Sequence, residues 1–151
     1  MDRNPSLIEK IRADPALYLS PGRTIVAEDL ALELVNDALY LGADEVRVVQ
    51  HDGWTFVGAS MDWLSEGSKW KPEECFFRVE FIHEFRQNAN RSAVLLGAFA
   101  TDIAIFGQDR EVAVLGCTEG TDRLAQVVSR RVPLARVVAF RLAAQPSTSA
   151  A

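Results

Sequence analysis

Two carboxylates in an apolar stretch of the chain, Glu33 and Asp37, have the spacing to form one site. Residues 24–41 carry apolar side chains three and four positions apart, which is typical of an amphipathic helix. Side chains four positions apart on a helix lie one turn apart on the same face, so the two carboxylates would be neighbours. The alternative interpretation is that both are partly exposed and only solvate the edge of the helix. The lack of evident partners favours this alternative.

Aromatic and basic side chains form two further groups. Trp54, Trp63 and Trp70 lie close together in the sequence, and Lys69 and Lys71 flank the last of them. Tryptophan is enriched where proteins bind one another, so this group predicts either a protein-binding surface or ordinary core packing. The basic group is expected to solvate a helix and its end rather than to contact DNA, because the chain has a formal net charge of -5. Its members are Arg123, Arg130, Arg131 and Arg136.

The elements that must position these residues follow from the spacing of apolar side chains and from turn-forming residues. Helices are predicted over residues 6–12, 24–41, 92–101 and 121–131. Strands are predicted over residues 45–50, 54–60, 103–106, 111–115 and 137–142, with a hairpin turn at Asp52 and Gly53. Residues 75–85 fit a strand and a helix equally well. This order predicts an α+β fold, a two-layer sandwich in which helices cover one face of a mixed or antiparallel sheet.

Length and composition predict one domain over residues 1–142 and a disordered, low-complexity tail over residues 143–151. Leu32 and Leu39 widen the apolar surface of the helix over 24–41, so we expect this helix to be well buried. No apolar run has the length of a signal peptide or a membrane span, which predicts a cytoplasmic protein. Two cysteines are too few for a disulfide framework or a cysteine-built zinc site.

Three segments together resemble one superfamily of ATPases. Residues 11–19, IRADPALYL, resemble the I-R-x-R-P-x-M-Y-I segment at the start of the DNA gyrase B subunit. Residues 33–43, ELVNDALYLGA, resemble the E-L-V-E-N-S-L-D-A-G-A helix of the MutL mismatch-repair ATPases. Residues 92–106 look like the helix and strand that follow the ATP lid in both. In this order, over roughly residues 8–116, they resemble the GHKL ATPases, which also include sensor histidine kinases and the large heat-shock chaperones.

The resemblance implies roles for several polar residues. Glu33 stands where the family's glutamate activates the attacking water. Asp37 stands where an asparagine ligates Mg²⁺, and the asparagine is displaced to Asn36. Counted from the helix, Asp62 takes the place of the aspartate that binds adenine, whereas counted from the hairpin turn that place falls on Ala59. Neither alignment keeps the Asn-Gly that follows in the family.

The loop that would bind phosphate also departs from the family's pattern. The family has a glycine-rich loop there, whereas residues 87–92 contain no glycine. Asn88, Asn90 and Ser92 would have to supply the nucleotide contacts, since asparagine also adopts left-handed conformations. Trp63, which follows Asp62, would fill an adenine pocket or displace the backbone beside it.

These departures predict a degenerate GHKL-type domain that acts as a non-catalytic protein-binding or regulatory module. Its expected partner is another protein or a second copy of the chain, and no cofactor, direct nucleic-acid contact or membrane is expected. The alternative is a functional gyrase B-like ATPase that binds ATP and Mg²⁺. In that case Glu33 is the general base, Asp37 holds the metal and Asp62 binds adenine. A third possibility is a gyrase-like accessory protein that acts near DNA without contacting its phosphates.

Overall fold

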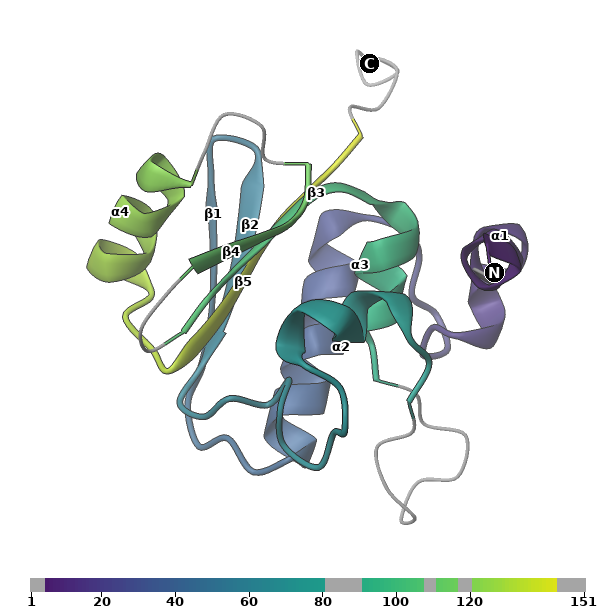
Figure 1. The fold of residues 1–151 in the computed structure, drawn as a ribbon, viewed down its shortest axis with the longest axis horizontal. Helices are drawn as coiled ribbons and strands as arrows, with labels where there is room; N and C mark the ends of the chain where they lie inside the picture. Colours follow the sequence, from purple (N-terminus) through teal and green to yellow (C-terminus); the bar gives the residue numbers. More distant parts are fainter. Residues whose placement is uncertain (1–4, 81–90, 108–110, 117–120, 144–151) are drawn as a thin grey trace.

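The computed structural model describes residues 5–80, 91–107, 111–116 and 121–143, and the statements below refer to these residues (Figure 1). The elements follow one another in a helix-rich first half and a strand-rich second half. In chain order they are α1 (Pro5–Ala13), η1 (Pro15–Leu17), α2 (Ala27–Tyr40), β1 (Val46–His51), β2 (Trp54–Ala59), η2 (Pro72–Phe77), α3 (Ala93–Phe99), β3 (Ala100–Phe106), β4 (Glu111–Leu115), α4 (Asp122–Arg131) and β5 (Arg136–Leu142). The two η elements are single 3-10 helices.

The strands form one antiparallel sheet in the order β1-β2-β5-β3-β4. β1 and β2 form a hairpin whose turn has a φ of 51° at Asp52 and 84° at Gly53, positive values that these two residue types tolerate. β5 pairs with β2 on one side and with β3 on the other, so the last strand of the chain lies in the middle of the sheet. β1 and β4 are the two edges.

Helices α1, α2 and α3 lie on one face of the sheet and enclose the main core (Figure 1). Leu34 of α2, Leu96 of α3 and Val57 of β2 are completely buried in this core. α1 is held against α3 by a hydrogen bond of 2.6 Å from Arg12 Nε to the carbonyl of Ala98. The main core therefore fixes α2 and α3 relative to the sheet, and these two helices carry the candidate site.

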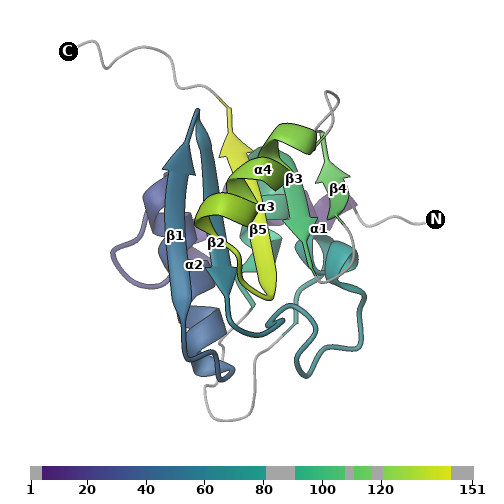
Figure 2. The ribbon, with the colours of Figure 1, turned by 90° about the vertical axis from the view of Figure 1, so that its left-hand side faces the viewer.

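Helix α4 lies on the opposite face, where it forms a second, smaller core (Figures 1 and 2). Leu124 of α4 packs there against residues such as Phe56 and Val137 of the sheet. The backbone approaches closely at Gly58, where a Cβ would contact the side chain of Val132. Most of the helical cover thus lies on one face, as predicted, and α4 adds cover to the other.

The α+β class and the antiparallel sheet are confirmed. Each predicted helix and strand is present, β4 with the predicted ends and the others with ends shifted by one to three residues. The segment over 75–85, which fits a strand and a helix equally well, begins within η2, and its residues 81–85 lie outside the described residues. Residues 144–151 of the expected tail also lie outside them. The expectation that Leu32 and Leu39 widen the buried surface of α2 is wrong. They are 41% and 51% exposed because they lie on the side of α2 that faces away from the core. Every helix in the described ranges is too short or too polar to span a bilayer.

Candidate functional site

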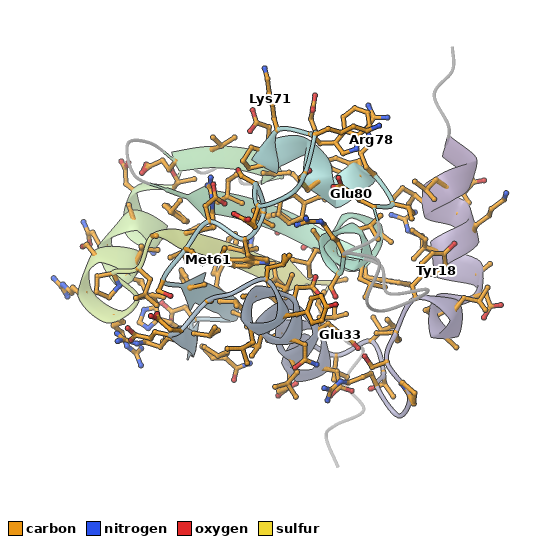
Figure 3. All side chains as sticks on the ribbon, turned by 90° about the horizontal axis from the view of Figure 1, so that it is seen from below. Tyr18, Glu33, Met61, Lys71, Arg78 and Glu80 are labelled. Atoms are coloured by element: carbon orange, nitrogen blue, oxygen red, sulfur yellow. The ribbon has the colours of Figure 1, made fainter. Side chains whose placement is uncertain are left out.

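Glu33 connects α2 to the segment that precedes it in the chain. Its carboxylate is buried on the side of α2 that faces this segment (Figure 3). Ser20 donates its backbone N–H to Oε2 at 2.8 Å and its hydroxyl to Oε1 at 3.0 Å. Arg23 Nε lies 3.6 Å from Oε2. Because both carboxylate oxygens accept from groups within the chain, Glu33 anchors residues 20–23 to α2.

Asp37, one turn further along α2, holds the start of α3. Ser92 donates its backbone N–H to Oδ2 at 2.6 Å and its hydroxyl to Oδ1 at 3.2 Å. Burial raises the pKa of Asp37 to about 7, although the hydrogen bonds from Ser92 act in the opposite direction. The negative charge of Glu33 raises the pKa further and the positive charge of Arg91 lowers it. Asp37 therefore changes its protonation state near neutral pH.

The expectation that Glu33 and Asp37 are partly exposed at the helix edge is wrong, since they are only 5% and 7% exposed. The two carboxylates do share one face of α2, but this face packs against residues 20–23 and α3 rather than against solvent. The fold also brings Ser92 to the pair, so one of the predicted nucleotide-binding residues joins it. Asn88 and Asn90 lie outside the described residues.

Arg91, next to Ser92, is a buried cation beside these carboxylates. Its guanidinium group donates to the carbonyl of Trp63 at 2.9 Å and to that of Glu66, and it lies 3.6 Å from Oε1 of Glu80. Trp63 is 1% exposed and belongs to the main core. Its side chain therefore occupies part of the main core directly after Asp62, where the resemblance would place Asn-Gly.

The three tryptophans do not form one surface. Trp63 and Trp70 pack on the main core, whereas Trp54 packs on the core of the opposite face. Trp70 lies near the surface with the guanidinium carbon of Arg78 at 4.1 Å from its ring centre. Core packing, one of the two alternatives for this group, thus accounts for Trp63, and the three tryptophans do not form a common surface.

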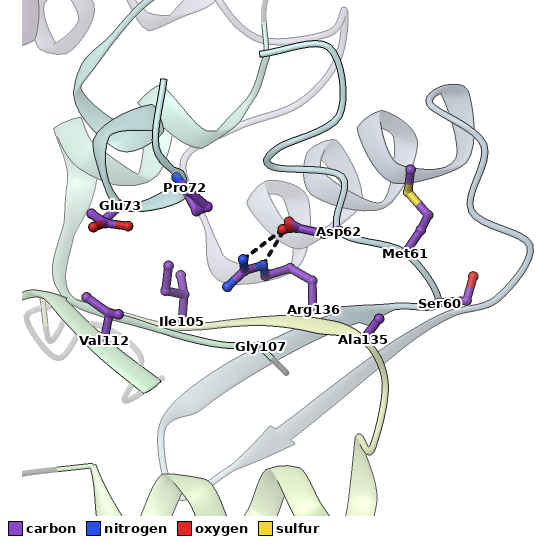
Figure 4. Close-up of a pocket in the computed structure, with 10 residues that line it drawn as sticks. All are labelled: Ser60, Met61, Asp62, Pro72, Glu73, Ile105, Gly107, Val112, Ala135 and Arg136. Atoms are coloured by element: carbon purple, nitrogen blue, oxygen red, sulfur yellow. Dashed lines mark hydrogen bonds and ion pairs between the residues drawn. The ribbon is translucent and has the colours of Figure 1, made fainter. Parts of the chain in front are cut away.

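Asp62 lies away from the carboxylate pair, in the wall of a cavity of about 470 Å³ at one end of the sheet (Figure 4). Arg136 donates from Nε and Nη2 to the two carboxylate oxygens, both at 2.8 Å. Burial of the Asp62 carboxyl raises its pKa, but hydrogen bonds from Arg136 and Ser65 and the charge of Arg136 outweigh burial, so the pKa is lowered. Asp62 therefore stays ionised at neutral pH and bound to Arg136.

Polar and apolar side chains both line this cavity around the ion pair, with Ser60 and Glu73 among the polar ones. Pro72, Ile105 and Val112 lie on the guanidinium side of this pair, and Met61 lies on the side of Asp62 (Figure 4). Glu33, Asp37 and Ser92 are not among the lining residues. The candidate residues therefore form two separate sites, one of Glu33, Asp37 and Ser92 and the other of Asp62 and Arg136.

Glu33, Asp37 and Ser92 do not fit a Mg²⁺ site. Mg²⁺ needs ionised oxygens with open coordination positions, whereas both oxygens of Asp37 accept from Ser92 and its pKa of about 7 favours the neutral acid below that pH. Within the described part of the chain, no three histidine, cysteine or acidic side chains come together as a metal site. The geometry assigns these carboxylates to holding α2, α3 and the 20–23 segment in place.

No family model, no curated protein and no solved structure matches the chain. The resemblance to the GHKL ATPases therefore stays a prediction. The proposed function depends on the geometry around the Glu33–Asp37 pair and the Asp62–Arg136 pair.

Sequence reasoning missed the residues that donate hydrogen bonds to these carboxylates. Ser20 is 13 positions from Glu33, and Arg136 is 74 positions from Asp62, so neither pair has a local signal. Arg136 was expected to solvate a helix end, and instead it is half of a partly buried ion pair. The contacts of Arg91 with the carbonyls of Trp63 and Glu66 likewise join residues 28 and 25 positions apart.

Proposed function

We propose that this chain is a non-catalytic protein-binding module built on a degenerate GHKL-type domain. The proposal is carried by one observation. The three carboxylates that would do nucleotide chemistry, Glu33, Asp37 and Asp62, all accept hydrogen bonds from partners within the chain. A general base must reach the proton that it removes, and a metal ligand must offer an oxygen to the ion. These three side chains instead stabilise the fold.

A binding role is supported by apolar side chains that remain at the surface. Leu17 is 71% exposed, and Leu39 of α2 is half exposed. Exposed apolar side chains supply the apolar contacts of surfaces that bind other proteins. The acidic net charge of -5 favours a protein partner over nucleic-acid phosphates.

Titration of the full chain with a fluorescent ATP analogue, with and without Mg²⁺, tests the proposal. We expect no saturable binding up to about millimolar nucleotide, and the same result for Asp62→Ala. Circular dichroism of both chains serves as the control for folding. Mg²⁺-dependent binding in the micromolar range that Asp62→Ala abolishes would instead establish the ATPase alternative.

A further inference from the structure

Strand β1 is an edge of the sheet that lacks the usual protection against pairing with another chain. Protected edges carry charged side chains, a proline or a bulge, or are very short. The one arginine of β1, Arg47, is bonded to Glu45 and to the carbonyl of Arg131 on the face of α4. β1 has six residues, VRVVQH, without proline, and its register with β2 is continuous. The other edge, β4, has five residues and a register irregularity against β3. An added strand therefore fits β1 better than β4.

The hydrogen-bonding groups of this edge belong to alternate residues of β1. The N–H of Ser60 donates to the carbonyl of Glu45 at 3.0 Å, in line with the register of the hairpin. In an antiparallel pair, hydrogen-bonded and non-bonded positions alternate, so every second residue from Glu45 directs its N–H and C=O groups towards β2. The residues between them direct these groups outward, and they are Val46, Val48 and Gln50.

The side chains of the same residues lie on the face of the sheet that α2 covers. Val46 packs against the main core, whereas Val49 packs against the core of the opposite face, and side chains alternate along a strand. Val48 therefore faces the α2 side, where it is 44% exposed. A strand bonded to this edge would place every second side chain beside Val48, on the same side as α2.

Helix α2 presents an apolar stripe towards solvent beside this edge. Leu32, Val35 and Leu39 lie at positions i, i+3 and i+7 and so share one face of the helix. The opposite flank of α2 carries Glu33 and Asp37, which point to residues 20–23 and to α3. Figure 2 shows α2 behind β1 and β2, at the β1 end of the sheet. The stripe and Val48 together are the apolar part of what we call the β1 edge surface.

Charges at the two ends of β1 indicate which occupant fits. Asp44 and Glu45 precede the strand and Asp52 follows it, and all three are exposed. Arg47 lies opposite Gly58, on the face of α4, where it bonds to Glu45 and to the carbonyl of Arg131. A second copy paired antiparallel would bring the acidic residues of one strand end next to those of the other, which is unfavourable. A segment with lysine or arginine at its ends meets opposite charges.

We propose that the β1 edge surface takes an extended segment of a partner protein as an additional strand. Alternate apolar side chains of this segment lie against Val48 and the α2 stripe, and its basic ends face Asp44, Glu45 and Asp52. Backbone hydrogen bonds supply affinity in this mode of binding, and alternate side chains supply specificity. The inference rests on the proposed protein-binding function and names the surface and the chemistry of its partner.

The test uses the ¹⁵N-labelled full chain and two peptides that differ only in their ends. The probe is Lys-Lys-Thr-Val-Thr-Val-Thr-Val-Lys-Lys, and the matched control has glutamate in place of each lysine. Amide hydrogen exchange reports each backbone position. With the lysine peptide, we expect the exchange rates of the Val46, Val48 and Gln50 amides to fall by about tenfold or more. The glutamate peptide should leave these rates unchanged. Unchanged exchange with both peptides, or equal protection by both, overturns the proposal.

Two variants locate the effect at this edge. Val48→Pro removes an outward N–H at a position where an edge strand accepts proline, and Val48→Thr keeps it. We expect the first to abolish protection by the lysine peptide and the second to retain it. Leu39→Glu, on the exposed side of α2, gives a second route to the same loss if Val48→Pro does not fold. Protection that persists in Leu39→Glu and in folded Val48→Pro overturns the proposal.

Sedimentation of the wild-type chain excludes the other occupant. We expect a monomer, and a dimer that Val48→Pro dissociates would assign the edge to a second copy and overturn the proposal. The outcomes are separable from those of the ATP titration. Mg²⁺-dependent ATP binding contradicts the non-catalytic function whatever the peptides do, whereas unprotected β1 amides contradict only the peptide site.

Discussion

At the scale of single residues, the buried carboxyl of Asp37 makes stability depend on pH. Its pKa rises from the ordinary value of 3.8 to about 7 on folding because burial disfavours the ionised form. Between these two values the unfolded chain releases the proton while the folded chain keeps it. The contribution of Asp37 to stability is therefore fully present below pH 3.8 and is lost as the pH rises to about 7. Over this window the loss amounts to roughly 4 kcal/mol.

Asp37→Asn removes this titration and keeps an oxygen that accepts the N–H of Ser92. We expect the free energy of unfolding of the variant, relative to wild type, to increase from about pH 4 to about pH 8. Urea unfolding followed by tryptophan fluorescence measures both chains. A difference that stays constant over this range would contradict the raised pKa.

The ion pair between Asp62 and Arg136 predicts the opposite dependence on pH. The pKa of Asp62 is lowered, so its contribution to stability is present above its ordinary value of 3.8 and is lost as the pH falls through the lower folded value. Asp62→Asn leaves the guanidinium group of Arg136 without its charged partner. Because the Asp62 side chain is partly exposed, we expect a loss of about 1 kcal/mol at neutral pH that shrinks in acid. A double-mutant cycle with Arg136→Gln measures the coupling, and independent effects of the two substitutions would contradict it.

At the scale of elements, the contact between η2 and α3 depends on Gly97. A Cβ at Gly97 would overlap the backbone carbonyl of Phe76, so alanine there must push η2 and α3 apart. Alanine otherwise favours a helix by about 1 kcal/mol, and we expect steric overlap to reverse that sign. Gly97→Ala should lower the free energy of unfolding by about 3 kcal/mol.

The matched control for this prediction is Gly58→Ala, whose Cβ meets the side chain of Val132 rather than a backbone group. A valine side chain can shift, so we expect a smaller loss of about 1 kcal/mol. Chemical denaturation of both variants compares them directly. Equal losses, or a more stable Gly97→Ala chain, would contradict the role assigned to the η2–α3 contact.

Local patterns in the sequence predict most elements, because a helix or a hairpin depends on residues close in the chain. The turn at Asp52 and Gly53 and the helix over 121–131 are examples. The position of β5 in the middle of the sheet has no such signal, since its pairings join residues far apart. The same reason hides the bond between Asp62 and Arg136. The exposure of Leu39 has no sequence signal either. The spacing of apolar residues shows which of them share a helix face, but it does not show how much of that face the rest of the fold covers.

At the scale of the whole molecule, we expect nucleotide to add no stability to the folded chain, because Glu33, Asp37 and Asp62 already bond to groups within it. A ligand that binds only the folded chain raises stability by about 2.7 kcal/mol when its concentration is 100 times its Kd. In a domain of this size each kcal/mol shifts the Tm by roughly 2–4 °C, so a nucleotide bound in this way would be readily detected. We expect Mg²⁺–ATP at about millimolar concentration to leave the Tm unchanged.

The same melting experiment separates nucleotide binding from strand addition. The lysine-flanked peptide binds only the folded β1 edge, so it should raise the Tm, and Val48→Pro should remove that rise while keeping its own Tm insensitive to Mg²⁺–ATP. Magnesium alone and the glutamate-flanked peptide are the controls. A rise in Tm with Mg²⁺–ATP that disappears on adding a chelator would contradict the engagement of Glu33, Asp37 and Asp62 within the fold. Those carboxylates would then have to leave Ser20, Ser92 and Arg136 for the nucleotide.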